Sequence, residues 1–198
     1  MNDYTEIKND NQLIREMNNW NVKDELKGFP VEKILEHQAC CGFSVALLNV
    51  DGGLNVGSII RSANIFGAWE VFLIGKKRYD KRSTVGAHNY IDIIHIDEDC
   101  LTEESALRAI SAIKEHGTNP IAIEQGGIYI DDTIGIHTPL RYLAAPCFIF
   151  GSENEGIPEC LSSKIPKYSI EQHGVMRSLN VAAAAAIVMY EFTRRETI

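Results

Sequence analysis

Short apolar runs alternate with helical stretches along this chain from residue 43 onward, and this alternation constrains the fold more than any other feature. Strands are predicted at residues 43–50, 70–74, 91–96, 120–124, 147–150 and 167–170. Helices are predicted at residues 56–66, 103–116, 158–163 and 178–195, with Thr102 as an N-cap, and a loop-rich stretch at 125–139. Strands that alternate with helices predict an α/β fold in which a parallel sheet carries helices on both faces.

Residues 1–38 follow a different pattern, because they are polar and rich in Asn. Apolar residues recur there at helical spacing in two groups, Leu13, Met17 and Trp20, then Val31, Ile34 and Leu35. Gly28 and Pro30 interrupt the pattern between the groups. We therefore predict a short helical N-terminal extension at residues 1–38 and one globular domain at residues 39–198.

The composition fits a globular domain with a substantial core. Hydrophobic residues make up 45% of the 198 residues and charged residues 23%, which excludes disordered and fibrous proteins. The longest apolar stretches, at residues 43–50 and 181–190, fall short of the roughly 20 residues that a membrane-spanning helix needs. The N-terminal residues lack the basic and apolar regions of a signal peptide. We expect a cytoplasmic protein with no membrane partner.

The cysteines and histidines predict no metal site. Five cysteines occur with no Cys-x-x-Cys pair and no His at ligand spacing: Cys40, Cys41, Cys100, Cys147 and Cys160. Reduced, mostly buried thiols are the interpretation that we prefer. The six histidines are equally scattered, so neither a zinc site nor another metal centre is expected.

The net charge of −8 argues against a non-specific nucleic-acid binder, because Lys and Arg supply most of the affinity for phosphate. A local basic face is still present in the sequence, where five cations fall close together: Lys76, Lys77, Arg78, Lys81 and Arg82. RNA could dock on this face if the acidic residues lie elsewhere. The alternative is a solvated loop with ordinary surface cations.

Three separated segments carry the polar residues that indicate a function. Residues 55–67 read Asn-Val-Gly-Ser-Ile-Ile-Arg-Ser-Ala-Asn-Ile-Phe-Gly, and residues 150–158 read Phe-Gly-Ser-Glu-Asn-Glu-Gly-Ile-Pro. The third segment, residues 165–191, contains Gly-Val-Met-Arg-Ser-Leu-Asn-Val followed by an alanine run. In this order the segments resemble the SpoU (TrmH) branch of the SPOUT RNA methyltransferases. The resemblance covers roughly residues 43–195 and leaves the first forty outside.

This resemblance implies a fold and an activity that the periodicity does not predict. The implied fold adds a deep trefoil knot at the C-terminus, a feature nearly absent from proteins in general. The implied activity is transfer of a methyl group from S-adenosyl-L-methionine to a ribose 2′-hydroxyl of tRNA, with rRNA as the second choice. The implied protein is a homodimer that needs no metal and binds RNA rather than DNA.

By resemblance, the catalytic set is Arg61, Asn55, Glu153, Ser178 and Asn180. Arg61 presents a planar fork of donors suited to a phosphate, and it stays charged at ordinary pH. A general base must accept a proton, which a guanidinium that stays protonated cannot do, so we favour a role in orienting the nucleophile and stabilising the developing alkoxide. Asn55 is expected to orient Arg61 or to cap its helix. Glu153 is expected to accept hydrogen bonds from Asn55 or Arg61, although Glu155 lies near enough in sequence to compete for this assignment.

The cofactor and the RNA each receive an expected set of residues. The resemblance assigns S-adenosylmethionine to Glu124, Gly151, Ile170, Leu179 and Ser178, and the start of the last helix could hold an anion or the cofactor carboxylate. The expected RNA-binding residues are Arg61, Lys77, Arg78, Arg82 and Arg177. Arg177 is similar to the residue found in the relatives that methylate a guanosine ribose in tRNA.

The chain departs from the common sequence pattern of the family in two places. Ile-Glu-Gln-His stands before Gly174 where many relatives have Ile-Pro-Met, and alanines follow Asn-Val where Ser is frequent. Each segment also has a purely structural interpretation: an exposed helical Arg61, a turn with two surface acids, and a buried alanine helix.

Two other functions compete with the methyltransferase hypothesis. One is an RNA-binding protein that keeps the knot fold without catalysis. The other is a nucleotide-binding enzyme with a phosphate loop at residues 51–57, but this segment lacks the Gly-Lys-Ser/Thr ending of such loops.

Overall fold

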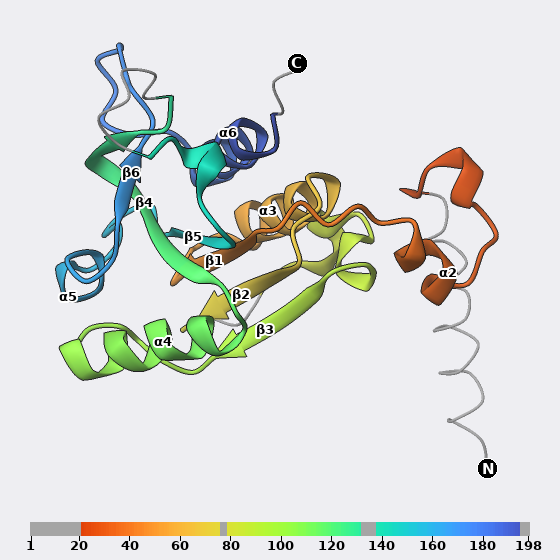
Figure 1. The fold of residues 1–198 in the computed structure, drawn as a ribbon, viewed down its shortest axis with the longest axis horizontal. Coiled ribbons are helices and arrows are strands. Elements are labelled where there is room, and N and C mark those ends of the chain that lie inside the picture. Colours follow the sequence, from red (N-terminus) through yellow and green to blue (C-terminus); the bar gives the residue numbers. More distant parts are fainter. Residues whose placement is uncertain (1–20, 76–78, 132–137, 195–198) are drawn as a thin grey trace.

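The computed structural model describes residues 21–75, 79–131 and 138–194. In these ranges, six strands form one sheet in the order β3-β2-β1-β5-β4-β6, and every neighbouring pair is parallel (Figure 1). The strands are β1 (Ser44–Leu48), β2 (Glu70–Ile74), β3 (Asp92–Ile96), β4 (Asn119–Tyr129), β5 (Pro146–Phe150) and β6 (Lys167–Ser169). The predicted parallel α/β sheet is confirmed.

Helices lie on both faces of this sheet. The α-helices are α2 (Val31–Glu36), α3 (Gly53–Ile65), α4 (Glu103–Glu115), α5 (Glu159–Ser162) and α6 (Val181–Thr193). Short 3-10 helices, which the sequence patterns did not indicate, are η2 (Asp24–Leu26), η3 (Lys81–Thr84), η4 (Ala87–Asn89) and η5 (Leu140–Tyr142). The helices α3 and α6 pack on one face, and α4 and α5 on the other.

The central strands are apolar on both sides because each side faces a different helical layer. Val45 and Leu47 of β1 belong to the core beneath α3 and α6, whereas Ala46 and Leu48 belong to the core beneath α4 and α5. Successive side chains of a strand point to opposite faces, so a strand buried on both faces reads as a continuous apolar run. All five residues of β1 are buried, and so are all five of β5.

Local signals set most of the element ends. Thr102 caps α4 as predicted, because its side chain accepts a hydrogen bond from the N–H of Ser105 at 3.2 Å. The predicted start of α3 at residue 56 was wrong, since the helix begins at Gly53. The predicted end of β4 at residue 124 was also wrong, because the register between β4 and β6 shifts between Ile123 and Ile128 and pairing then resumes. Pairing can resume across such an irregularity when the strand bulges.

The described N-terminal segment lies beside α3, away from β4 and β6 (Figure 1). The predicted helix around residues 31–35 is confirmed as α2, whereas Leu13, Met17 and Trp20 lie outside the described residues. The N–H of Cys41 donates to the carbonyl oxygen of Gly67 at 2.8 Å and ties this segment to the end of α3. No helix in the described ranges is both long enough and apolar enough to span a membrane.

Candidate active site

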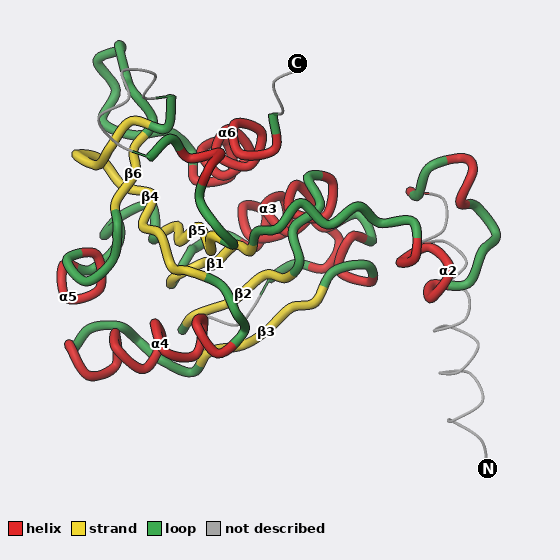
Figure 2. The backbone as a smooth tube through the Cα atoms, viewed as in Figure 1, coloured by secondary structure: helices red, strands yellow, loops and turns green. Residues whose placement is uncertain are grey.

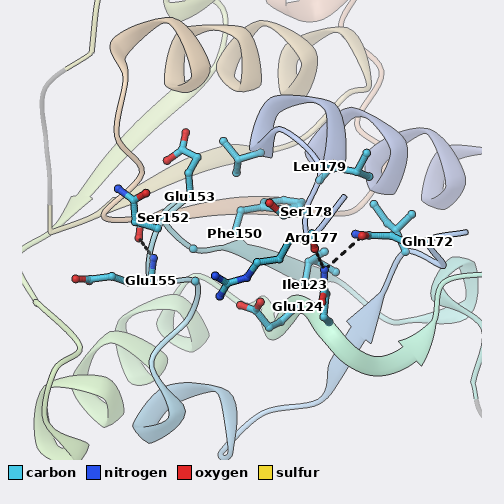
Figure 3. A pocket seen from close by; sticks show the side chains of 17 residues that line it. Ile123, Glu124, Phe150, Ser152, Glu153, Glu155, Gln172, Arg177, Ser178 and Leu179 are labelled. Carbon is cyan, nitrogen blue, oxygen red and sulfur yellow. Dashed lines mark hydrogen bonds between the residues drawn. The ribbon is translucent and has the colours of Figure 1, made fainter. Parts of the chain in front are cut away.

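A cavity of about 240 Å³ lies where β5 and β6 end and β4 continues beyond its pairing with β5 (Figure 3). The loop between β6 and α6 projects from the same end of the sheet (Figure 2). Ligand sites of open α/β sheets lie at the carboxyl ends of the strands. Three stretches supply the lining: 123–125, 150–156, and residues from 170 to 184. The second and third of the motif segments therefore meet in one cavity.

The loop after β5 folds back on itself and leaves no room for side chains at two positions. The N–H of Gly156 donates to the carbonyl oxygen of Ser152 at 2.9 Å. A Cβ on Gly151 would lie 2.2 Å from the carbonyl carbon and oxygen of Gly156, closer than real contacts allow. Gly156 itself has a φ of +69°, in the region that glycine adopts most readily. The shape of the loop therefore explains both glycines of the Gly-x-Glu-x-x-Gly motif, and these glycines expose main chain to the cavity.

Glu124 fastens this loop to β4. Its carboxylate accepts a hydrogen bond from the N–H of Ile157 at 2.9 Å. A Cβ on Gly156 would lie 2.8 Å from the same carboxylate, so the second glycine of the motif also makes room for Glu124. Glu124 was predicted as a cofactor-binding residue, and the structure places it in the lining of the cavity. Its side chain therefore both holds the loop in place and lines the cavity.

A chain of hydrogen bonds joins all three motif segments. Asn55 Nδ2 donates to Glu153 Oε1 at 2.5 Å, and the N–H of Asp51 donates to Glu153 Oε2 at 3.3 Å. Asn180 Nδ2 donates to Asn55 Oδ1 at 3.1 Å. Asn180 Oδ1 accepts from the N–H groups of Ala182 at 3.0 Å and Ala183 at 3.3 Å. Residues separated by 98 and 125 positions in the chain thus form one network.

The network fixes which way its amides point. Only an amide oxygen can accept from the backbone of α6, so Asn180 must present its NH₂ group to Asn55. Asn55 then receives this bond on its oxygen and must donate to Glu153. The predicted bond between Asn55 and Glu153 is confirmed, but the suggestion that Asn55 caps its helix is wrong, because Gly52 occupies the N-cap of α3.

The last helix begins two to three residues later than predicted. Asn180 is its N-cap, and the first helical residue is Val181. Its side chain satisfies two of the N–H groups that a helix start leaves without intrahelical partners. Ser178 lies before the helix and lines the cavity together with Leu179 and Ile170.

Arg61 lies away from this cavity. It is exposed on α3, six residues after Asn55, which corresponds to about 9 Å along a helix axis. There it lines a second cavity of about 480 Å³, shared by the described N-terminal segment, the end of α3 and η4. The structure therefore brings together four of the five predicted catalytic residues, whereas Arg61 lies away from them at the second cavity.

The predicted RNA-binding cations are dispersed. Lys77 and Arg78 lie outside the described residues. Arg82 is exposed, and its Nη2 lies 2.9 Å from Asp80 Oδ2. The hydrogen bonds from Arg82 lower the pKa of Asp80, which stabilises the carboxylate. Arg177 lines the first cavity, and Figure 3 shows its guanidinium directed into it.

Gln125 and Gln172 are site residues that the sequence analysis missed. Gln125 Nε2 donates to the carbonyl oxygen of Arg177, and it lies 3.4 Å from Gln172 Oε1 (Figure 3). These contacts fix the loop before α6 against β4. Gln172 belongs to the Ile-Glu-Gln-His stretch that departs from the common sequence pattern of the family. This departure was the signal that could have identified Gln172 as a site residue.

The described residues offer no cluster of three or more His, Cys, Asp or Glu side chains that could hold a metal ion. All five cysteines are free thiols, and Cys100 and Cys147 are buried. Burial, with neighbouring Cys160, raises the pKa of Cys100 to about 12, so this thiol stays protonated at neutral pH.

The sequence matches the model of the SpoU rRNA Methylase family over residues 42–190. It is 25% identical over 155 residues to a tRNA (guanosine(18)-2'-O)-methyltransferase of Mus musculus, covering 75% of this chain and 9% of that protein. It is 25% identical over 145 residues to the tRNA (guanosine(18)-2'-O)-methyltransferase of Escherichia coli K12, covering 71% and 58% respectively. The chain therefore spans less than two thirds of the length of these curated relatives.

The fold is also shared with solved structures. The crystal structure of the A. aeolicus TrmH/SpoU tRNA modifying enzyme superposes with a TM-score of 0.65 at 20% identity, covering 82% of both chains. An rRNA methyltransferase from Sinorhizobium meliloti superposes with a TM-score of 0.62 at 26% identity, covering 79% of this chain and 57% of that one.

Proposed function

This chain belongs to the SpoU rRNA methylase family, and on that premise we propose that it methylates a ribose 2′-hydroxyl of RNA with S-adenosylmethionine as methyl donor. The observation that carries the proposal is the hydrogen-bonded network of Asn55, Glu153 and Asn180 beside a cavity built by the same motifs. The two relatives named above are tRNA methyltransferases, which favours tRNA as the substrate, and rRNA is the second candidate.

The cavity residues fit an adenosyl cofactor. The glycine-bounded loop at residues 151–156 exposes main chain to the cavity, which suits hydrogen bonding to a nucleoside. Apolar walls for a purine come from Ile123, Phe150, Ile170 and Leu179. Three carboxylates, Glu124, Glu153 and Glu155, give this lining the charge that suits a sulfonium ion. S-adenosylmethionine, when bound, would supply a methyl group that a ribose 2′-oxygen could take by direct displacement, with S-adenosylhomocysteine as the leaving group and the hydroxyl proton released to water.

The chain's own residues contribute mainly by positioning. Glu153, held by Asn55 and by the N–H of Asp51, keeps the loop after β5 against the start of α3. Asn180 ties the start of α6 to the same point. We assign Ser178 to the cofactor or the ribose because it lines the cavity between these elements.

In our proposal, Arg61 serves this site from a second copy of the chain. Within one chain it lines a different cavity from Ser178 and Glu124. We propose a homodimer in which Arg61 of one copy binds a substrate phosphate near the cavity of the other, orienting the 2′-hydroxyl and stabilising the developing alkoxide. Exposed apolar side chains on α6 and the preceding loop support such an interface: Ile187, Tyr190, Val175 and Met176. Light scattering that gives a monomer mass at micromolar concentration would contradict it.

The knot and the domain division stay parts of the proposal. We propose that the segment after β6 passes through a loop of the chain, as membership of the family suggests. An experimental chain trace that passes beside the loop would contradict the knot. We keep residues 1–38 as a separate extension because the family match begins at residue 42. If residues 39–198 alone failed to fold, this division would be wrong.

Methyl transfer tests the proposed function directly. Labelled S-adenosylmethionine is supplied with unmodified tRNA or rRNA, and the wild type is compared with Arg61→Ala. We expect label in tRNA and a loss of about 100-fold or more in the variant, because removing a donor to a developing charge costs about that much. Arg108→Ala is the matched control, since Arg108 is an exposed arginine on α4 that pairs with Glu98 at 2.6 Å. Absent transfer to both RNAs, with absent cofactor binding, would favour the non-catalytic RNA-binding alternative.

A further inference from the structure

Arg177 is the one cation among the described residues that line the first cavity. Its side chain points into the cavity toward the loop after β5, near Glu124 (Figure 3). Its main chain is held there by Gln125, whose side-chain amide donates to the carbonyl oxygen of Arg177. The main chain of Arg177 is therefore held in place at the wall of the cavity, and the guanidinium extends from there.

Two of the three carboxylates around it already have donors of their own. Glu124 accepts from the N–H of Ile157 at 2.9 Å, and Glu153 accepts from Asn55 at 2.5 Å. The cavity lining carries three carboxylates against one guanidinium. An anionic group that enters this space would be repelled by those carboxylates and would find one side chain that attracts it.

Two N–H donors at the start of the nearby helix α6 are already occupied. From the sequence, the start of the last helix could hold an anion or the cofactor carboxylate, but the N–H groups of Ala182 and Ala183 donate to Asn180 Oδ1. Because the cap occupies these donors, a carboxylate in the cavity needs another partner. The Arg177 guanidinium can supply it with two parallel N–H donors.

We propose that Arg177 binds the α-carboxylate of the adenosyl cofactor, an inference that rests on the proposed function. The methionine part of the cofactor carries one carboxylate and two positive groups. In this cavity the carboxylate pairs with Arg177, and the positive groups face Glu124, Glu153 and Glu155. Arg177 is thereby a cofactor-binding residue that lines the site rather than a contact to RNA phosphate.

Two ligands that differ in the amino-acid part test this assignment. S-adenosylhomocysteine carries the carboxylate, whereas 5′-methylthioadenosine has the same adenosine and thioether but lacks the amino-acid part. Calorimetric titration of the full chain compares wild type with Arg177→Gln. We expect the Kd of S-adenosylhomocysteine to rise about tenfold or more, the usual size for a hydrogen bond to a charged group, and that of 5′-methylthioadenosine to change less than about twofold.

Arg108→Gln is the control, because it removes an exposed arginine on α4 and should leave both Kd values unchanged. Equal weakening of both ligands by Arg177→Gln would overturn the assignment, since the residue would then support the cavity as a whole. Weakened RNA binding with unchanged S-adenosylhomocysteine affinity would overturn it in favour of a phosphate contact. A wild type that binds neither ligand would overturn the proposed function and this inference with it.

Discussion

Gly151 has no space for a side chain, and this single position decides whether the loop after β5 can take its shape. A Cβ there would lie 2.2 Å from the carbonyl group of Gly156, which is main chain and cannot move without the loop. Forcing an extra carbon into such a packed position typically costs about 1–3 kcal/mol. The cost would fall on the loop that borders the proposed cofactor.

Gly151→Ala should therefore weaken S-adenosylhomocysteine binding by about tenfold, the equivalent of about 1.4 kcal/mol. Gly174→Ala is a matched control in the loop before α6, because no heavy atom lies within 4 Å of the added Cβ. Calorimetry on the two variants gives both affinities. Equal affinities in the two variants would show that the loop tolerates the added carbon.

At the level of elements, the start of α6 links the fold to the site. Asn180 accepts from two N–H groups of the helix and donates to Asn55 in α3. Replacing an N-cap Asn by Ala usually costs about 1 kcal/mol. Removal of this side chain would also leave the amide oxygen of Asn55 without its donor.

Asn180→Ala should lower the free energy of unfolding by about 1–2 kcal/mol in chemical denaturation. Asn154→Ala serves as the control, because Asn154 is an exposed Asn that lines the same cavity. An Asn180→Ala protein as stable as the control would mean that neither the cap nor the network contributes to stability.

Element positions were predictable where periodicity alone decides them. The strands β1, β2, β3, β5 and β6 begin and end within two residues of their predicted limits, because apolar runs and turn residues mark them. The start of α6 was not predictable in this way, since Ser178 and Asn180 are both good N-cap residues. Only the hydrogen bond from Asn180 to the distant residue Asn55 distinguishes them. The extension of β4 to Tyr129 depends on pairing with β6, which no local pattern reports.

For the whole molecule, the resemblance located most site residues but not their arrangement. Asn55, Glu153 and Asn180 are matched motif positions, yet the network depends on the sheet order that places β5 between β1 and β4. Arg61 likewise lies at the second cavity because it follows Asn55 by six residues along helix α3. Sequence spacing cannot show that Arg61 lines a different cavity from Ser178 and Glu124.

The acceptor atom is the central claim, and the position of the transferred methyl group tests it most directly. RNA methylated with labelled S-adenosylmethionine is hydrolysed in alkali and its fragments are separated. Alkaline cleavage needs a free 2′-hydroxyl, so a methylated ribose leaves an uncleaved, labelled dinucleotide. We predict label in that alkali-resistant dinucleotide. Label recovered in single nucleotides would place the methyl group on a base and contradict the proposed 2′-O-ribose transfer.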